Sequence, residues 1–160
     1  MNEVDPSQFR QLLGRYPTGV AVVTANAADG TPAGMTVNSL TSVSLVPPLV
    51  SICVDTTADM HRVLHQTDRF ILNLLAADQE TISRRFAGQD ENRFEGIGYR
   101  LNEHGLIVLD GVIAHIECER HATFEAGDHT IFVARVTDGT TASGRPLLYY
   151  RGGYTALSDR

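Results

Sequence analysis

Short apolar segments separated by turn residues run through the chain, and most of them show the two-residue period of a β-strand. The clearest alternation lies in residues 112–124, where Val112, Ala114, Ile116 and Cys118 share one face. The opposite face of this segment carries His115, Glu117, Glu119 and His121. The other segments that we expect to form strands are residues 20–25, 34–45, 49–54, 69–76, 130–138 and 146–150.

Three short helices are predicted from capping residues and apolar spacing. Asp5, followed by a proline, is suited to begin a helix that Gly14 ends. Thr56 and Asp59 have the spacing of a capping box, and they precede an apolar stripe of helical period. Asp78 is suited to cap a third helix, which a glycine closes ten residues later.

The number and order of these elements favour a mostly β fold. At least six strands with only short, separated helices predict a mostly antiparallel barrel with peripheral helices, since a parallel α/β fold needs a helix between most pairs of strands. Residues 88–111 are rich in glycine, asparagine and charge, and we expect mostly loop there. No repeat or linker divides the chain, so residues 1–160 are predicted to form a single domain.

The most unusual segment is residues 34–54, GMTVNSLTSVSLVPPLVSICV, which carries no charge yet is dense in serine, threonine and asparagine. Apolar and polar side chains alternate over most of residues 35–45, so the polar groups of the expected strand share one face. Such a face suits solvent. It equally suits a flat heteroaromatic ligand with a ribityl chain and a phosphate, which needs hydroxyl and backbone hydrogen bonds more than charge.

Composition excludes several classes of protein. The formal net charge of −6 and pI near 5.4 argue against nucleic acid as a partner, which would require clustered lysine and arginine. No apolar run approaches the length of a membrane span, and no signal peptide is visible. Cys53 and Cys118 each lie in an apolar run, as reduced buried thiols do. We therefore expect a cytoplasmic protein that binds neither nucleic acid nor membrane.

Motifs for other chemistries are missing or weak. The chain lacks a Rossmann fingerprint, a phosphate loop and a hydrolase elbow. His61 and His65 have helical spacing but lack the glutamate of a metalloprotease, so exposed helix histidines are favoured over a metal site. The polar face of residues 115–121 is read as a solvated face or a subunit contact, with metal binding as the alternative. His129 follows Gly127 and Asp128 at an expected hairpin turn.

Five segments together resemble the short-chain flavin reductases, which are the reductase components of two-component monooxygenases. The segments are YPTGVAVVTA, GMTVNSLTSVSLVPPLVSICV, SRRFAG, GDH and LLYYRGGYTAL. They follow the order of that family and cover nearly the whole chain. The resemblance implies a six-stranded split barrel of the FMN-binding type that works as a homodimer. It also implies an oxidoreductase that transfers hydride from NADH to FMN or FAD and supplies reduced flavin to a monooxygenase.

The resemblance also assigns candidate site residues. It implies that the flavin ring and ribityl chain contact Thr36, Val37, Asn38, Ser39 and Thr41, and lie over Ser51 and Cys53. Thr57 is implied near the phosphate, Arg85 and Phe86 on the opposite side, and Pro17, Thr18 and Gly19 around the rim of the ring. His129 and Tyr154 are implied to face the nicotinamide, with His129 as the catalytic candidate. No metal is expected.

Two other functions remain open from the sequence. A split-barrel protein could carry flavin without reducing it, although such a carrier would not need the histidine of the GDH turn. An oxidase of the pyridoxamine-phosphate type would call for basic residues near the pocket, and residues 30–54 contain none. The choices between FMN and FAD and between NADH and NADPH stay undecided, as do the identity of the oxygenase and whether flavin is held or released.

Overall fold

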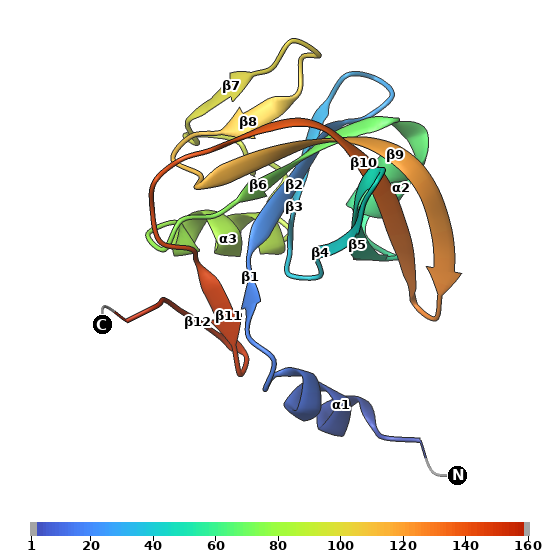
Figure 1. Cartoon of the computed structure of the whole chain (residues 1–160), viewed down its shortest axis with the longest axis vertical. Helices are drawn as coiled ribbons and strands as arrows, with labels where there is room; N and C mark the ends of the chain where they lie inside the picture. The colour runs from blue at the N-terminus through green and yellow to red at the C-terminus, as the bar shows by residue number, and fades with distance from the viewer. Residues whose placement is uncertain (1–2, 159–160) are drawn as a thin grey trace.

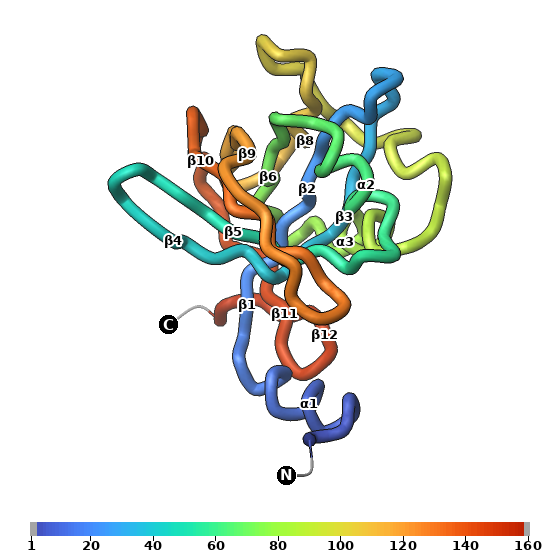
Figure 2. Tube along the Cα trace, turned by 90° about the vertical axis from the view of Figure 1, so that its right-hand side faces the viewer, coloured from blue at the N-terminus to red at the C-terminus, as the bar shows by residue number. Residues whose placement is uncertain are grey.

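The fold is built on one antiparallel sheet that curves into a split barrel (Figure 1). The computed structural model describes residues 3–158. The seven strands of this sheet follow the order β3-β2-β6-β9-β10-β5-β4. Their bounds are β2 (Ala21–Asn26), β3 (Pro32–Val37), β4 (Thr41–Leu45), β5 (Pro48–Asp55), β6 (Arg69–Leu74), β9 (Ala114–Ala126) and β10 (His129–Thr141). The edge strand β4 belongs to a hairpin with β5 that projects from the body (Figure 2), so the other six strands form the predicted barrel.

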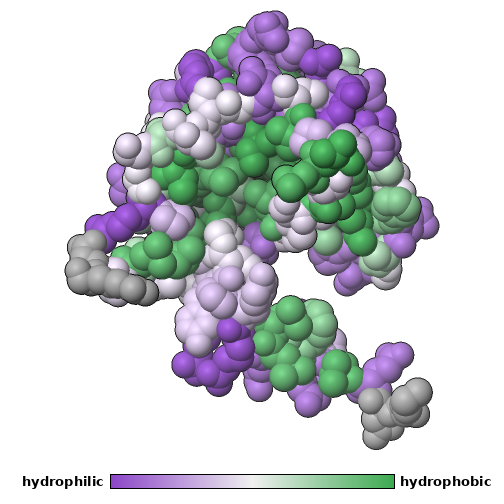
Figure 3. All heavy atoms as spheres, viewed as in Figure 1, coloured by the Kyte–Doolittle hydropathy of each residue, from purple (hydrophilic) through white to green (hydrophobic). Residues whose placement is uncertain are grey.

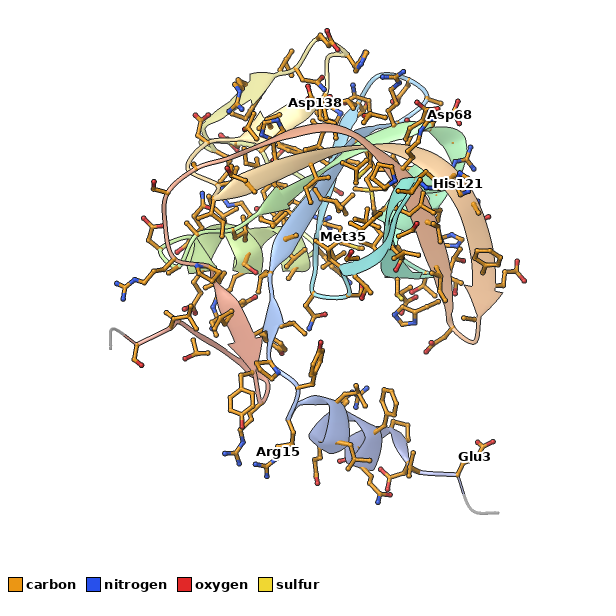
Figure 4. All side chains as sticks on the ribbon, viewed as in Figure 1. Glu3, Arg15, Met35, Asp68, His121 and Asp138 are labelled. Carbon is orange, nitrogen blue, oxygen red and sulfur yellow. The ribbon has the colours of Figure 1, made fainter. Side chains whose placement is uncertain are left out.

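The barrel is split between β3 and β5, which lie near opposite edges of the sheet. Helix α2 (Asp59–Gln66) contacts both strands and covers this gap. Its Met60, Val63 and Leu64 are at most 3% exposed and pack with Phe132 of β10, while Met35 of β3 packs against the same core (Figure 4). The apolar stripe predicted for this helix is confirmed. In the structure, this stripe faces the core and closes the barrel.

A second layer covers the other side of β2 and β6. It contains α3 (Glu80–Ala87), β7 (Tyr99–Leu101) and β8 (Ile107–Leu109). The prediction of mostly loop over residues 88–111 missed the β7–β8 hairpin, because strands of three residues are too short to show a period. Asn73 fixes this layer: its side chain donates to Val22 O and accepts from the Leu109 amide at 2.9 Å.

The expected continuous strand over residues 34–45 is wrong. Strand β3 ends at Val37, the chain bends through residues 38–40, and β4 begins at Thr41. The cause is the Ser39 hydroxyl, which accepts a hydrogen bond from the Cys53 amide at 2.9 Å and donates to the Cys53 carbonyl at 3.1 Å. A side chain thus occupies backbone groups of β5 to which a straight strand could have paired.

Two predicted helix caps are also wrong. Ala58 is the N-cap of α2, and Thr56 instead donates its hydroxyl to Asp128 O at the β9–β10 turn. The N-cap of α3 is Gln79 and not Asp78. The Gln79 side chain accepts from the Ala76 amide and donates to Asp110 O, so it connects the start of α3 to the loop after β8.

The terminal segments stand apart from the barrel. Helix α1 (Pro6–Leu13) has the predicted Asp5 cap and ends at Gly14, yet it buries none of its residues. Strands β1 (Thr18–Gly19), β11 (Leu148–Tyr150) and β12 (Gly153–Thr155) form a small sheet between α1 and the barrel (Figures 1 and 2). No helix within residues 3–158 is long and apolar enough to cross a membrane.

Two groups of exposed apolar side chains stand out among those on the surface. On and after α1 they are Phe9, Leu12, Leu13 and Tyr16, and on the β4–β5 hairpin they are Val43, Leu45 and Val46. Leu45 and Val46 are 87% and 93% exposed, which few apolar residues are without a function. Figure 3 shows apolar surface on α1 and on the side of the barrel that faces it across an open hollow.

Candidate functional site

The C-terminal part of β3 is held from behind by α3 and the segment after it. A Cβ at Gly34 would lie 2.6 Å from a ring carbon of Phe86, so only glycine allows this close approach. Thr36 donates its hydroxyl to the Ser83 carbonyl at 2.7 Å, and Arg93 donates to Gly34 O at 2.8 Å. Since Phe86 is 1% exposed, it supports β3 from inside the protein.

The bend after β3 presents an unpaired amide side chain. Asn38 is exposed, and its side chain makes no hydrogen bond to any residue of the described range 3–158. The neighbouring Ser39 hydroxyl is fully used on the Cys53 backbone. Ser51 and Cys53 are half-buried on the face of β5 that points away from the barrel core, and Thr41 pairs with Ser51 across the β4–β5 hairpin.

The end of β5 meets the turn between β9 and β10. Asp55 Oδ1 accepts from both the amide and the hydroxyl of Thr57 at 2.7 Å, and these hydrogen bonds lower the pKa of the Asp55 carboxyl. His129 pairs with Asp55 in the β5–β10 register, and its Nδ1 lies 2.7 Å from Asp128 Oδ1. The His129 side chain is 43% exposed, so its ring is accessible from solvent next to Asp55 and Thr57.

The segment before β2 contributes a buried hydroxyl without a partner. Thr18 Oγ1 is shielded from solvent, and no hydrogen-bond partner exists for it within residues 3–158. Thr18 pairs with Tyr149 of β11, while the flanking Pro17 and Gly19 are exposed. Because an unsatisfied buried hydroxyl costs roughly 1–3 kcal/mol, a shift of the surrounding residues that let a ligand atom bond it would be favoured.

Tyr154 points its hydroxyl into the protein. Its oxygen lies 2.8 Å from Ser83 Oγ, its ring packs against Tyr149 at 5.4 Å, and the Arg84 guanidinium lies 4.9 Å above the ring. Arg85, on the next position of α3, is half-buried and donates to Glu95 O. The structure therefore gives both residues partners inside the chain.

Hydrogen bonds and strand pairing connect most of the predicted residues into one band over the surface. We call this set the polar band: Thr18, Thr36, Asn38, Ser39, Thr41, Ser51, Cys53, Thr57, His129 and Tyr154. Val37 was also predicted to contact flavin, but its side chain is 5% exposed and packs in the barrel core. Ser39 joins β3 to β5, Asp55 joins Thr57 to the register of His129, and Ser83 joins Thr36 to Tyr154. Arg85 and Phe86 lie behind this band, and Pro17 and Gly19 flank it.

The band suits the ring and ribityl chain of a flavin better than its phosphate. Asn38 and Thr18 offer uncharged groups with free hydrogen-bonding capacity, and the face of β5 beside them is only partly polar. Thr57, in contrast, has its amide and hydroxyl on the Asp55 carboxylate, which would repel a phosphate. A phosphate at Thr57 therefore stays a prediction, and the negative charge of Asp55 next to Thr57 disfavours it.

The histidines outside the band differ in burial and in their hydrogen-bond partners. No group of three or more His, Cys, Asp or Glu within residues 3–158 could hold a metal ion. His115 was predicted on a solvated face or a subunit contact, but it is 7% exposed and hydrogen-bonded to Thr140 Oγ1 at 3.0 Å. His61 Nε2 likewise lies 2.9 Å from Thr130 Oγ1, whereas burial and the neighbouring His61 lower the pKa of the exposed His65.

Comparison with known proteins agrees with this geometry. The model of the flavin reductase like domain matches residues 13–158. A flavin reductase of Pseudomonas putida is 43% identical over 152 residues, which span 94% of this chain and 89% of that protein. The structure of the NADH:FAD oxidoreductase of Streptomyces globisporus, in complex with NAD and FAD fragments, superposes with a TM-score of 0.91 at 39% identity, covering 99% of this chain and 98% of that one.

A second solved structure gives the same result. The styrene monooxygenase flavin reductase of Pseudomonas putida S12 superposes with a TM-score of 0.86 at 36% identity, covering 95% of this chain and 99% of that chain. The chain belongs to the flavin reductase like domain family. The resemblance and the mostly β split barrel expected from the sequence are thereby confirmed.

Two structural residues of the site were missed from the sequence. Ser83 is fully buried and contacts both Thr36 and Tyr154, and Asp55 holds Thr57. Ser83 lies in the SRRFAG segment, where the arginine and the phenylalanine were preferred as ligand contacts. Nothing in the local pattern marks a helix serine as a partner of two distant strands. Asp55 could have been found from its place two residues before Thr57, which favours an Asx turn.

The two cysteines allow a direct test of the band. Burial, with the nearby Glu117 charge, raises the pKa of the Cys118 thiol to about 12, so almost no thiolate forms there at mildly alkaline pH. We expect a thiol reagent to modify Cys53 alone in the folded protein and both cysteines in urea. Flavin at ten times its dissociation constant should slow the reaction of Cys53 about tenfold by mass action. An unchanged rate with flavin present would remove Cys53 from the site, with Cys118 in urea as the control for reagent activity.

Proposed function

We propose that this chain is an NADH-dependent flavin reductase that delivers reduced FMN or FAD to a monooxygenase. The observation that carries the proposal is the polar band, an uncharged hydrogen-bonding surface with an orphan hydroxyl at Thr18 and a free amide at Asn38. The matching relatives support it, since they include NADH-dependent FAD and FMN reductases and reductase subunits of flavin-dependent monooxygenases.

The chain's own part in this reaction is binding and orientation. When bound, NADH supplies a hydride and the flavin ring accepts it. Asn38 and Thr18 would hold the flavin through neutral hydrogen bonds, and His129 would present its exposed ring to the nicotinamide. No carboxylate or other strong general base needs to act, because the step moves a hydride between two aligned rings. Asn38 and the Thr18–Thr36 side of the band would therefore set ring alignment.

A flavin carrier without reductase activity is the alternative. The direct experiment mixes the purified protein with NADH and free FMN, then with FAD, and follows the loss of NADH. A reductase consumes NADH in proportion to enzyme, whereas a carrier binds flavin and leaves NADH intact. Repeating the assay with NADPH decides the nicotinamide preference, and comparison of the two flavins decides between FMN and FAD.

We further propose that the working unit is a homodimer. In one chain the polar band is an open surface, and the uncovered apolar residues of α1 and the β4–β5 hairpin border the hollow next to it (Figure 3). A second copy related by twofold symmetry would cover both apolar elements at once.

The proposed cellular setting is the cytoplasm, supported by two cysteines that form no disulfide. The family match over residues 13–158 supports one functional domain over residues 1–160.

Leu45→Asp tests the homodimer. Light scattering at micromolar concentration should give a dimer mass for the wild type. Burying an unpaired carboxylate in the contact should cost about 3 kcal/mol, or roughly a hundredfold in the dimer dissociation constant. Leu101→Asp is the matched control, since Leu101 is 59% exposed on β7, away from this surface. A monomeric wild type, or equal effects of the two variants, would contradict the proposal.

His129→Ala tests the nicotinamide side. We expect flavin affinity to stay nearly constant while kcat/KM for NADH falls roughly 5- to 150-fold, the cost of one oriented contact at about 1–3 kcal/mol. His121→Ala is the control, because His121 is exposed on the same hairpin and lies on the outer side of the barrel (Figure 4). If kcat/KM stays within about twofold, ordinary for a surface change, His129 is a turn residue only. A collapse of flavin binding would instead place His129 in the flavin site.

A further inference from the structure

Ser83 contacts both β3 and the β11–β12 hairpin, and it does so through separate groups. Its backbone carbonyl accepts the Thr36 hydroxyl from β3 at 2.7 Å, and its side-chain hydroxyl lies 2.8 Å from the Tyr154 hydroxyl of β12. The side chain is fully buried, so water cannot replace the tyrosine. The contact therefore fixes the distance between two elements that are 118 residues apart in sequence, from Thr36 to Tyr154.

The orientation of Tyr154 does not depend on this hydrogen bond alone. Its ring is held between Tyr149 at 5.4 Å and the Arg84 guanidinium at 4.9 Å. Arg84 is itself paired with Glu80 at 2.7 Å, one turn earlier on α3. A phenylalanine at position 154 would keep both ring contacts and lose only the hydroxyl. The bond to Ser83 can thus be removed without removing the packing around it.

The hairpin that Tyr154 belongs to carries the opposite side of the polar band. Tyr149 of β11 pairs with Tyr154 on one side and with Thr18 of β1 on the other. Thr18 has the orphan hydroxyl, and Thr36 begins the segment that presents Asn38. A shift of the hairpin relative to α3 would therefore move Thr18 relative to Thr36, and with it the two sides between which the rings must align.

We infer that Ser83 is a positioning residue for hydride transfer, which locks the β11–β12 hairpin and β3 into one alignment. The inference rests on the proposed reductase function and adds to it a residue that touches neither flavin nor NADH. It also assigns the Tyr154 hydroxyl to this lock.

A double-mutant cycle of Ser83→Ala and Tyr154→Phe tests the lock. Each single variant should lower kcat/KM for NADH about three- to tenfold, the effect of one neutral hydrogen bond. The double variant should fall by the same factor as either single variant, because both changes remove one shared bond. Tyr150→Phe is the matched control on the other strand of the same hairpin, since the Tyr150 hydroxyl has no hydrogen bond within residues 3–158. Unchanged kcat/KM in the single variants, or losses that multiply in the double variant, would overturn the inference.

Hydrogen exchange separates this inference from the proposed function. Amides of residues 148–155 should exchange faster in Ser83→Ala and Tyr154→Phe, by a common factor that the double variant repeats and Tyr150→Phe lacks. A bond that only stabilised the whole fold would speed exchange throughout the barrel and leave kcat/KM of the folded protein unchanged, which would also overturn the inference. If the wild type consumes no NADH with either flavin, the reductase function fails, and local exchange alone then decides whether Ser83 holds the hairpin.

Discussion

The two hydrogen bonds between the Ser39 hydroxyl and the Cys53 backbone determine the shape of the site. They end β3 at Val37 and turn the chain, so that β4 pairs with β5 rather than continuing along β3. Without that turn, residues 34–45 would form one flat strand with a solvated polar face. With it, Asn38 leaves the sheet while remaining next to β5. A side-chain hydrogen bond such as that of Ser39 can hold a bend in the chain while the neighbouring side chain, here Asn38, points outward.

The rest of the fold keeps this bend rigid. Helix α2 closes the barrel on one side of it, and α3 supports β3 from the other side through Gly34, Thr36 and Phe86. The site is thus a surface of one chain on a rigid support, and not a closed cavity within that chain. This explains why apolar residues remain exposed on both sides of the band: α1 and the β4–β5 hairpin have nothing to pack against in a single copy. In the proposed homodimer, the second copy would complete the wall of the site.

Much of the fold follows from local sequence. Asp5 and Gly14 bound α1 as expected, the stripe at Met60, Val63 and Leu64 faces the core, and Gly127 lies in the predicted β9–β10 turn with a φ of 64°. Each of these depends on residues within one or two turns of each other. The alternation is interrupted at Ser39, Leu40 and Thr41, but the apolar residues before and after them keep the same phase, so the interruption alone does not predict a bend. Its cause is a backbone pair 14 residues further along the chain.

The candidate site was predicted to a similar extent. The uncharged stretch and the GDH turn are two regions that the structure brings side by side, since His129 pairs with Asp55 of β5. That they bind the cofactors stays a prediction. Contacts decided the individual roles: Thr36, Ser39 and Thr57 use their hydroxyls inside the protein, while the Thr18 hydroxyl and the Asn38 amide have no partner within residues 3–158. Hydrogen-bond partners far apart in sequence leave no periodic signal. The sequence therefore could not distinguish polar residues that support the fold from polar residues that are free to contact a ligand. Ser83 was overlooked for the same reason.

The most direct test is a flavin titration of Asn38→Ala beside Asn26→Ala. The Asn26 side-chain amide donates to Gly105 O on the far side of β2. Asn26→Ala therefore removes the same kind of side chain as Asn38→Ala, but away from the proposed flavin surface. We predict that Asn38→Ala weakens flavin binding by about 1–3 kcal/mol, roughly 5- to 150-fold in the dissociation constant. The Asn26 variant should bind flavin as the wild type does. Equal dissociation constants for wild type and Asn38→Ala would contradict the assignment of the bend after β3 as the flavin surface.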